Sequence, residues 1–227
     1  ELTADMEAVF VHMASQSRLP RMHRMWVAPF DLHRNMVLRI EALGAAAARG
    51  EPTRIVAKMN ALTDEVLIAA LIKAGAQGVR IDLIVRGACT LPAQVPGQTD
   101  NIRVRSVIGR FLEHSRVFYF RSGDDESLYL SSADWMNRNM LRRIELAWPV
   151  NEPVLRQRLI DECLVAYLYD GRDAWDLVGD GTYRRVTDEA PGAVDAQGRP
   201  AVVRHGAQEA LMGRYGSRGL PRLAARA

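Results

Sequence analysis

The sequence predicts an α/β domain in which a mixed β-sheet is flanked by helices. In the first half of the chain, stretches with helical periodicity alternate with short apolar strands. From residue 102 onward, strand patterns follow one another with little between them. Hydrophobic residues make up 48% of the chain, which excludes a wholly disordered protein. A chain of 227 residues can bury one sizeable core, so one domain with a tail is the expected organisation.

The chain is expected to open with two helices separated by a short strand. The first helix begins with Thr3 as its cap and stops before Pro20. Its apolar stripe comprises Met6, Phe10 and Met13. A strand at residues 25–27 precedes the second helix, which opens at Asp31 and fades by Gly50. The apolar face of the second helix comprises Leu32, Met36, Ile40 and Leu43.

Two further strands are expected on either side of a third helix. Residues 55–60 form the first of these strands, and residues 79–86 form the second. The second strand is apolar at almost every position toward its end, as expected when both faces of a sheet are covered. The helix between them starts around Asp64 and ends at Gly75 or Gly78.

The second half begins with a loop around Pro92 and Gly97. Strands are then expected at residues 102–108, 115–120, 127–131 and 143–148. A turn at residues 123–125 joins the second and third of these strands, and Pro149 ends the last one. A long helix at 154–169 comes next, and its core stripe comprises Leu155, Leu159, Cys163 and Ala166.

The pattern weakens after Gly171. Residues 178–204 are rich in Gly, Asp, Arg and Pro, so an irregular basic tail over residues 172–227 is expected, with a short helix within it. No apolar run reaches the roughly 18 residues that span a bilayer. The chain opens with acidic residues instead of a signal peptide. These features predict a cytoplasmic protein without a transmembrane segment, and they leave peripheral association with a membrane open.

The charged residues favour a polyanionic ligand. The formal net charge is +3 and the isoelectric point is about 9.1. Arginine far outnumbers lysine, which occurs only at Lys58 and Lys73. Arginine presents a fixed fork of donors that matches phosphate, although a GC-rich genome produces the same bias. Cys89 and Cys163 form no cluster with histidines at metal-ligand spacing, so both are expected to be ordinary thiols.

The stretch around His114 carries the clearest chemistry. In a strand, residues i and i+2 point to the same face, so His114 and Arg116 are expected to emerge together. A histidine beside a fixed cation suits phosphoryl transfer, because the guanidinium binds phosphate oxygens and the imidazole moves a proton. Ser131 and Ser132, after the next strand, are candidate phosphate donors. The alternative is a structural histidine at a strand end that bonds to a backbone carbonyl.

Several runs of the sequence closely resemble the polyphosphate kinase family. The longest is NIRVRSVIGRFLEHSR at residues 101–116. The others are KMN at 58–60, IDLIVRG at 81–87, and SSADWM at 131–136 followed by Arg138 and Asn139. The likeness covers about residues 4–169 in one order, with weaker similarity at 174–175 and 208–211. A match of this length is far more specific than any short motif.

The resemblance implies a phosphotransferase. In this family a histidine takes the γ-phosphoryl group of ATP and passes it reversibly to polyphosphate, between two phospholipase-D-like domains. By resemblance, residues 1–20 are the last helix of the preceding domain or a linker. Residues 21–171 are then the C-terminal phospholipase-D-like domain, a layered α/β fold. The phosphorylated histidine and the Mg²⁺ ligands are expected outside this chain, so the isolated chain is expected to be inactive.

The resemblance also implies roles for individual residues. His114 is the expected catalytic residue, a second histidine that assists transfer. The residues expected to contact nucleotide or phosphate are Lys58, Asn60, Arg86, His114, Arg116, Ser131, Ser132 and Arg143. No metal ligand is expected here. The implied substrates are ATP or ADP and polyphosphate, and the implied partners are the other domains of the same kinase, in a homo-oligomer.

The sequence departs from the phospholipase D motif at two positions, which affects the alternative functions. The His-x-Lys pair of phospholipase D becomes His114-x-Arg116, and Arg121 stands where the usual aspartate falls. A self-sufficient phosphodiesterase that pairs two copies of this motif across a dimer is therefore a poor fit. A non-catalytic module that binds polyphosphate or nucleic acid through its arginines remains the main alternative to an enzyme.

Overall fold

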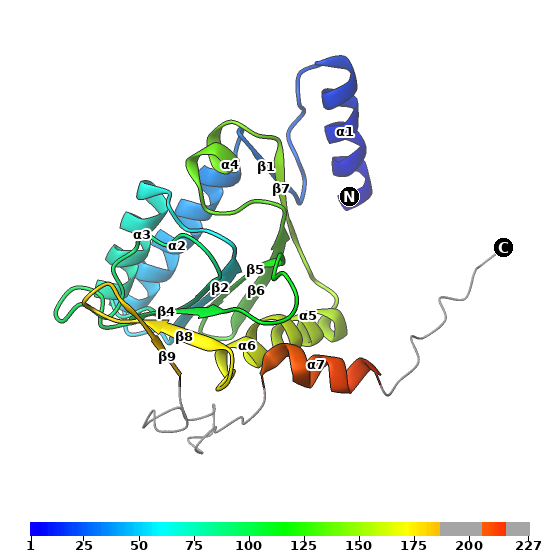
Figure 1. Cartoon of the computed structure of the whole chain (residues 1–227). Coiled ribbons are helices and arrows are strands. Elements are labelled where there is room, and N and C mark those ends of the chain that lie inside the picture. The colour runs from blue at the N-terminus through cyan, green and yellow to red at the C-terminus, as the bar shows by residue number, and fades with distance from the viewer. Residues whose placement is uncertain (187–205, 217–227) are drawn as a thin grey trace.

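The computed structural model describes residues 1–186 and 206–216 and confirms a mixed α/β architecture (Figure 1). The described residues form a nine-stranded sheet with the order β1-β7-β6-β5-β2-β3-β4-β8-β9. The strands are β1 (Trp26–Ala28), β2 (Thr53–Met59), β3 (Arg80–Val85), β4 (Ile102–Val107), β5 (Arg116–Ser122), β6 (Asp125–Ser131), β7 (Glu145–Pro149), β8 (Ala174–Leu177) and β9 (Tyr183–Arg185).

The centre of the sheet is parallel and its two sides are antiparallel. β2, β3 and β4 run parallel, and β2 reaches β3 through the helix α3 (Glu65–Ala76), because parallel neighbours need a crossover connection. β5 pairs antiparallel with both β2 and β6. The expected turn between β5 and β6 is confirmed. Gly123 has a φ of 57°, which a two-residue hairpin turn favours.

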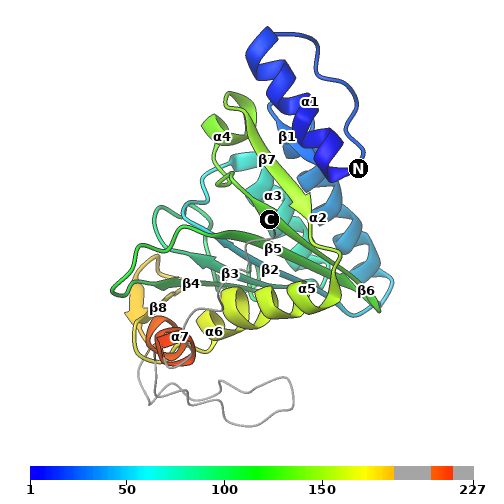
Figure 2. The same cartoon turned by 90° about the vertical axis from the view of Figure 1, so that its right-hand side faces the viewer.

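Helices cover both faces of the sheet (Figures 1 and 2). α2 (Leu32–Ala48) and α3 lie on one face, and the predicted stripe of α2 is buried there as expected. Asp64 caps α3 by accepting a hydrogen bond from the backbone N–H of Leu67 at 2.9 Å. The other face is covered by α5 (Pro153–Leu159), a π-helical turn η1 (Ile160–Val165) and α6 (Ala166–Leu168). The short helix α4 (Asn137–Leu141) was not expected.

The first helix differs from the prediction at both its start and its buried face. α1 spans Leu2–Ser15, so Thr3 lies inside it and is not its cap. Phe10 is 64% exposed and Met13 is 58% exposed. The buried residues are instead Asp5 and Val9. The carboxylate of Asp5 accepts backbone hydrogen bonds from residues 23, 24 and 25, and these bonds turn that side of the helix inward.

The predicted helix at 154–169 is real but is not a regular α-helix. The π-helical turn inserts an extra residue into its middle and rotates the later residues about the helix axis. Leu164 and Tyr167 are therefore buried, whereas Leu155, on the expected stripe but ahead of this turn, is 51% exposed. Cys163 only packs against the edge of the core.

The expectation of an irregular segment after Gly171 is wrong for the described residues. β8 pairs antiparallel with β4, because the outer edge of β4 would otherwise leave backbone groups unpaired. β9 then pairs with β8, and α7 (Ala207–Gly216) supplies the short helix. Most of the predicted irregular stretch, residues 187–204, lies outside the described residues. Among the described residues, no helix combines the length and hydropathy needed to cross a bilayer.

Candidate active site

Several of the predicted site residues lie at one edge of the sheet because of the strand directions. β2 and β3 both end there, as they are parallel. β5 runs antiparallel to β2, so its first residue, Arg116, lies beside the end of β2. Arg116 in turn pairs with Ser131, the last residue of β6. The segments that come after β2, β3 and β6 therefore meet the start of β5.

The segment after β6 is fixed against the segment after β2. Trp135 is fully buried, its N–H donates to the carbonyl of Ala61 at 3.1 Å, and its own carbonyl accepts from Thr63 at 2.9 Å. The preceding residue, Asp134, thereby lies within hydrogen-bonding distance of Asn60. Its Oδ1 accepts from the backbone N–H of Asn60 at 2.7 Å, and its Oδ2 accepts from Asn60 Nδ2 at 3.3 Å.

Asp134 and Arg116 form a buried ion pair. Arg116 Nε donates to Asp134 Oδ1 at 3.2 Å and Nη2 donates to Oδ2 at 2.8 Å, with both side chains 10% exposed. Burial raises the pKa of Asp134, but the hydrogen bonds and charge of Arg116, with the donors of Asn60, outweigh burial and hold that pKa below its usual value. The guanidinium is consequently fixed in orientation.

The third nitrogen of Arg116 reaches His114. Nη1 donates to His114 Nδ1 at 2.8 Å and to the backbone carbonyl of His114 at 2.7 Å. Because a guanidinium can only donate, Nδ1 must accept, and the proton of the neutral imidazole is assigned to Nε2. His114 is exposed and lies just before β5, not inside it, but it still meets Arg116 as the sequence predicts.

Arg86 joins the same network from the end of β3. Its Nε and Nη2 each donate to Asn60 Oδ1 at 3.2 Å, and its side chain is partly exposed. The next residue, Gly87, donates its N–H to the carbonyl of Asn60 at 2.7 Å. A Cβ on Gly87 would lie 2.9 Å from that oxygen, so the close approach of the two segments requires glycine.

A continuous hydrogen-bonded chain thus runs from His114 through Arg116, Asp134 and Asn60 to Arg86, and we call it the histidine–arginine network. Asp134 is the member that the sequence analysis did not assign to the site. The available signal was its place in the SSADWM run, but its partners lie far away in sequence.

Lys58 lies in a different place from the other predicted residues. Along β2 the side chains alternate, so Lys58 shares the face of Val56 and points under η1. Its Nζ lies 2.8 Å from Glu113 Oε2 and 3.2 Å from the centre of the Tyr167 ring, and its side chain is 4% exposed. Burial lowers the pKa of Lys58, and the opposing charge of Glu113 offsets only part of that effect.

The two serines bond to β7 and its surroundings. Ser131 Oγ donates to the carbonyl of Leu146 at 2.7 Å. Ser132 Oγ donates to Glu145 Oε2 at 2.5 Å. Arg143 is 61% exposed, and its Nη1 lies 4.0 Å from Glu145 Oε1. Both hydroxyl protons therefore stabilise the β6–β7 connection, whereas Arg143 stays accessible to solvent.

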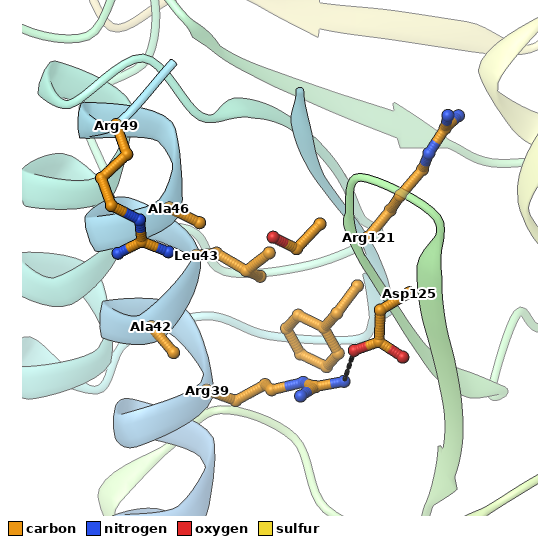
Figure 3. Close-up of a pocket in the computed structure, with 9 residues that line it drawn as sticks. Arg39, Ala42, Leu43, Ala46, Arg49, Arg121 and Asp125 are labelled. Atoms are coloured by element: carbon orange, nitrogen blue, oxygen red, sulfur yellow. Dashed lines mark ion pairs between the residues drawn. The ribbon is translucent and has the colours of Figure 1, made fainter. Parts of the chain in front are cut away.

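A cavity of about 240 Å³ lies at the far end of the sheet, between α2 and the β5–β6 turn (Figure 3). None of the predicted site residues lines it. Arg39 faces Asp125 at 3.7 Å, and Arg49 is paired with Glu51 outside the cavity at 2.7 Å. Arg121 extends away from the cavity (Figure 3). We assign no chemistry to this cavity.

The described residues do not fit a Mg²⁺ ion. They contain no group of three or more His, Cys, Asp or Glu side chains that could hold a metal. The one carboxylate of the histidine–arginine network, that of Asp134, has both oxygens occupied by Arg116 and Asn60.

Comparison with known proteins identifies the family to which the chain is similar. Residues 25–197 match the family model "Polyphosphate kinase C-terminal domain 2". Polyphosphate kinase of Paraburkholderia phytofirmans is 44% identical over 215 residues, which is 95% of this chain and 30% of that protein. Polyphosphate kinase of Pseudomonas aeruginosa is 48% identical over 186 residues, 82% of this chain and 27% of that protein.

A solved structure agrees with these sequence matches. The crystal structure of polyphosphate kinase from Porphyromonas gingivalis superposes with a TM-score of 0.80 and 34% identity, and the alignment covers 94% of this chain and 31% of that one. The chain therefore spans less than a third of the length of these relatives. The chain belongs to the polyphosphate kinase family and corresponds to its C-terminal domain 2.

Proposed function

We propose that this chain forms one wall of an active site that transfers the terminal phosphate of ATP reversibly to polyphosphate. The transfer proceeds through a phosphohistidine that lies outside this chain. The observation that carries the proposal is the histidine–arginine network, in which an exposed imidazole contacts the guanidinium of Arg116 and is linked through Asp134 and Asn60 to the guanidinium of Arg86. The nucleotide is ATP or ADP, and the partners are the other domains of the same kinase, working in the cytoplasm as a homo-oligomer.

The network suits phosphate binding and stabilisation of the charge that develops during transfer. Asn60 occupies Nε and Nη2 of Arg86, whereas Nη1 makes no hydrogen bond within the described residues and is available to a phosphate oxygen. Nε2 of His114 carries the one proton of the neutral imidazole, so it can donate a hydrogen bond to the oxygen of the departing phosphate and stabilise the charge that develops there. Arg116 acts on the substrate mainly by charge, since Asp134 and His114 occupy its donors. Mg²⁺, when bound, supplies further charge neutralisation from ligands outside this chain.

A non-catalytic module for polyphosphate or nucleic acid is less well supported. Such a module requires arginines that are free to meet phosphates. Several arginines of the sheet are instead paired with carboxylates. These pairs are Arg54–Asp82, Arg105–Asp176 and Arg116–Asp134.

The isolated chain is expected to have no kinase activity, because a covalent relay cannot run without its nucleophile. The test is to incubate the purified chain with ATP, Mg²⁺ and polyphosphate and to follow chain growth on a gel. Elongation at a rate near that of a full-length relative would contradict the proposal.

Replacing Arg86 with alanine, in a full-length kinase that carries this chain as its C-terminal domain, is expected to raise KM for ATP about tenfold, the usual worth of one charge-assisted contact. Arg86→Lys should recover only part of the loss, because lysine keeps the charge but not the fork. The control is Arg103→Ala, an exposed arginine on β4. Equal KM values in the Arg86 and Arg103 variants would exclude Arg86 from the nucleotide site.

A further inference from the structure

The loop that carries His114 is not held by hydrophobic burial. Residues 108–115 connect β4 to β5, and three large apolar side chains in this loop are exposed. Ile108 is 61% exposed, Phe111 is 52% exposed and Leu112 is 70% exposed. A catalytic imidazole must be held close to its productive position, since a displacement of about 1 Å can cost on the order of 100-fold in rate. Polar contacts must therefore fix this loop.

One such contact comes from Gln208 in α7, almost a hundred residues later in the sequence. Its Oε1 accepts from the backbone N–H of Phe111 at 2.8 Å, and its Nε2 donates to the carbonyl of Phe111 at 2.9 Å. A single side chain thereby replaces the strand partner that this backbone lacks. A Cβ on Gly109 would lie 2.5 Å from Gln208 Oε1, so the loop approaches the amide closely.

α7 is held on the layer of helices beneath the sheet (Figure 2). The backbone N–H of Ala207 donates to Asp170 Oδ2 at 2.7 Å. Further along the helix, Tyr215 donates its hydroxyl proton to Glu162, and Arg214 lies 3.5 Å from the same carboxylate. Gln208 is itself buried, and the helix that carries it is anchored at both ends.

The second contact is made by Glu113, the residue before His114. Its Oε2 lies 2.8 Å from Lys58 Nζ, and its Oε1 accepts from Tyr167 at 2.7 Å and from Gln208 at 2.5 Å. Burial raises the pKa of Glu113, but Lys58 and the two neutral donors outweigh burial and keep that pKa below its usual value. Glu113 is thus a partly buried carboxylate with donors from β2, α6 and α7.

Glu113 and His114 are successive residues of the loop, and their side chains lie in different environments. Glu113 contacts its three donors and is 12% exposed, whereas His114 is exposed and accepts from Arg116. We propose that Glu113 and Gln208 are positioning residues for His114, with Lys58 and Tyr167 holding Glu113 in place. This inference rests on the proposed catalytic role of His114. It gives the buried Lys58 a role that needs no contact with phosphate.

The first test is Gln208→Ala in the full-length kinase. We expect kcat to fall on the order of tenfold while KM for ATP changes less than about twofold, because the histidine is misplaced and the nucleotide contacts remain. Gln157→Ala is the matched control, since Gln157 is an exposed glutamine on the neighbouring helix α5. Thermal unfolding of each variant checks that the fold is kept.

A double-mutant cycle separates positioning from general stability. In a His114→Ala background, Gln208→Ala should cause no further loss of kcat, because there is no imidazole left to position. A further tenfold loss would overturn the inference. So would an unchanged kcat in Gln208→Ala when His114→Ala is inactive. If His114→Ala itself keeps the full rate, the proposed function fails instead.

Glu113→Gln supplies a second variant that keeps the shape of the side chain. It removes the charge that pairs with Lys58, so a loss of stability is expected along with the loss of kcat. The informative measurement is again the split between kcat and KM, compared at a temperature well below the unfolding midpoint. A rise in KM for ATP at constant kcat would contradict a positioning role and would place Glu113 in nucleotide binding.

Discussion

Replacing His114 with alanine in the full-length kinase is expected to lower kcat on the order of 100- to 1,000-fold, the range that one preorganised hydrogen-bond donor to developing charge contributes. Binding of polyphosphate should change little, because the arginines remain. The structural reason is that His114 is exposed while Arg116 holds its Nδ1. No other histidine among the described residues belongs to the histidine–arginine network.

Two companion variants make this result specific. His114→Gln can still accept a hydrogen bond from Arg116, but its single amide group cannot at the same time hold an N–H at the position of Nε2, so it should be nearly as slow as alanine. His23→Ala is the control, since His23 is 67% exposed and bonds to Asp5 beside α1. The measurements are ATP-dependent growth of polyphosphate and, for the reverse reaction, formation of ATP from ADP and polyphosphate. A His114→Ala enzyme with an unaltered rate would favour the polyanion-binding alternative.

Much of the fold could be predicted because the pattern of apolar residues is a local property. The face of α2 and the alternation of the first strands and helices can be derived from periodicity alone. The face of α1 could not be predicted this way, because the bonds that Asp5 makes to a later segment decide which side is buried. The π-helical turn at Ile160–Val165 could not be predicted either, because helical periodicity assumes a regular period of 3.6 residues.

In the site, likewise, contacts between near neighbours in the sequence could be predicted, and long-range contacts could not. The pairing of His114 with Arg116 could be predicted because the two residues are near neighbours in the sequence. The pairing of Lys58 with Glu113 could not be, since Glu113 lies 55 residues away. Nor could the bond between Glu113 and Gln208, because Gln208 belongs to a segment expected to be mostly irregular. Asp134 was overlooked for the same reason, because its significance depends on a long-range partner.

Replacing Asp134 with asparagine is expected to lower the free energy of unfolding by about 3–5 kcal/mol, the usual cost of leaving one member of a buried ion pair without its partner. Asparagine keeps the shape and can still accept from Asn60, so the loss reports the charge of Arg116 left without a counter-ion. The control is Asp180→Asn, because Asp180 is 53% exposed and pairs with Arg184 on the surface. Its effect on the free energy of unfolding should be close to zero.

The contribution of the Asp134 carboxylate to stability should depend on pH in a definite direction. The pKa of Asp134 is lower in the folded protein than in the unfolded chain, so its contribution to stability is complete above its usual pKa and is lost as the pH falls through its lower, folded value. The difference between the parent and Asp134→Asn, measured by denaturant unfolding, should therefore be largest near pH 7 and shrink below about pH 4. A constant difference across this range would mean that the loss comes from packing instead of charge.

Adding Arg116→Met to Asp134→Asn should then recover part of the stability, because the uncompensated charge is gone. Activity should not return with it. The imidazole of His114 would have lost the guanidinium that orients it, and the site would have lost a positive charge near the phosphates. Recovery of stability without recovery of rate would separate the two roles of this ion pair, since the fold needs only that the charge be balanced, whereas the site needs the guanidinium itself.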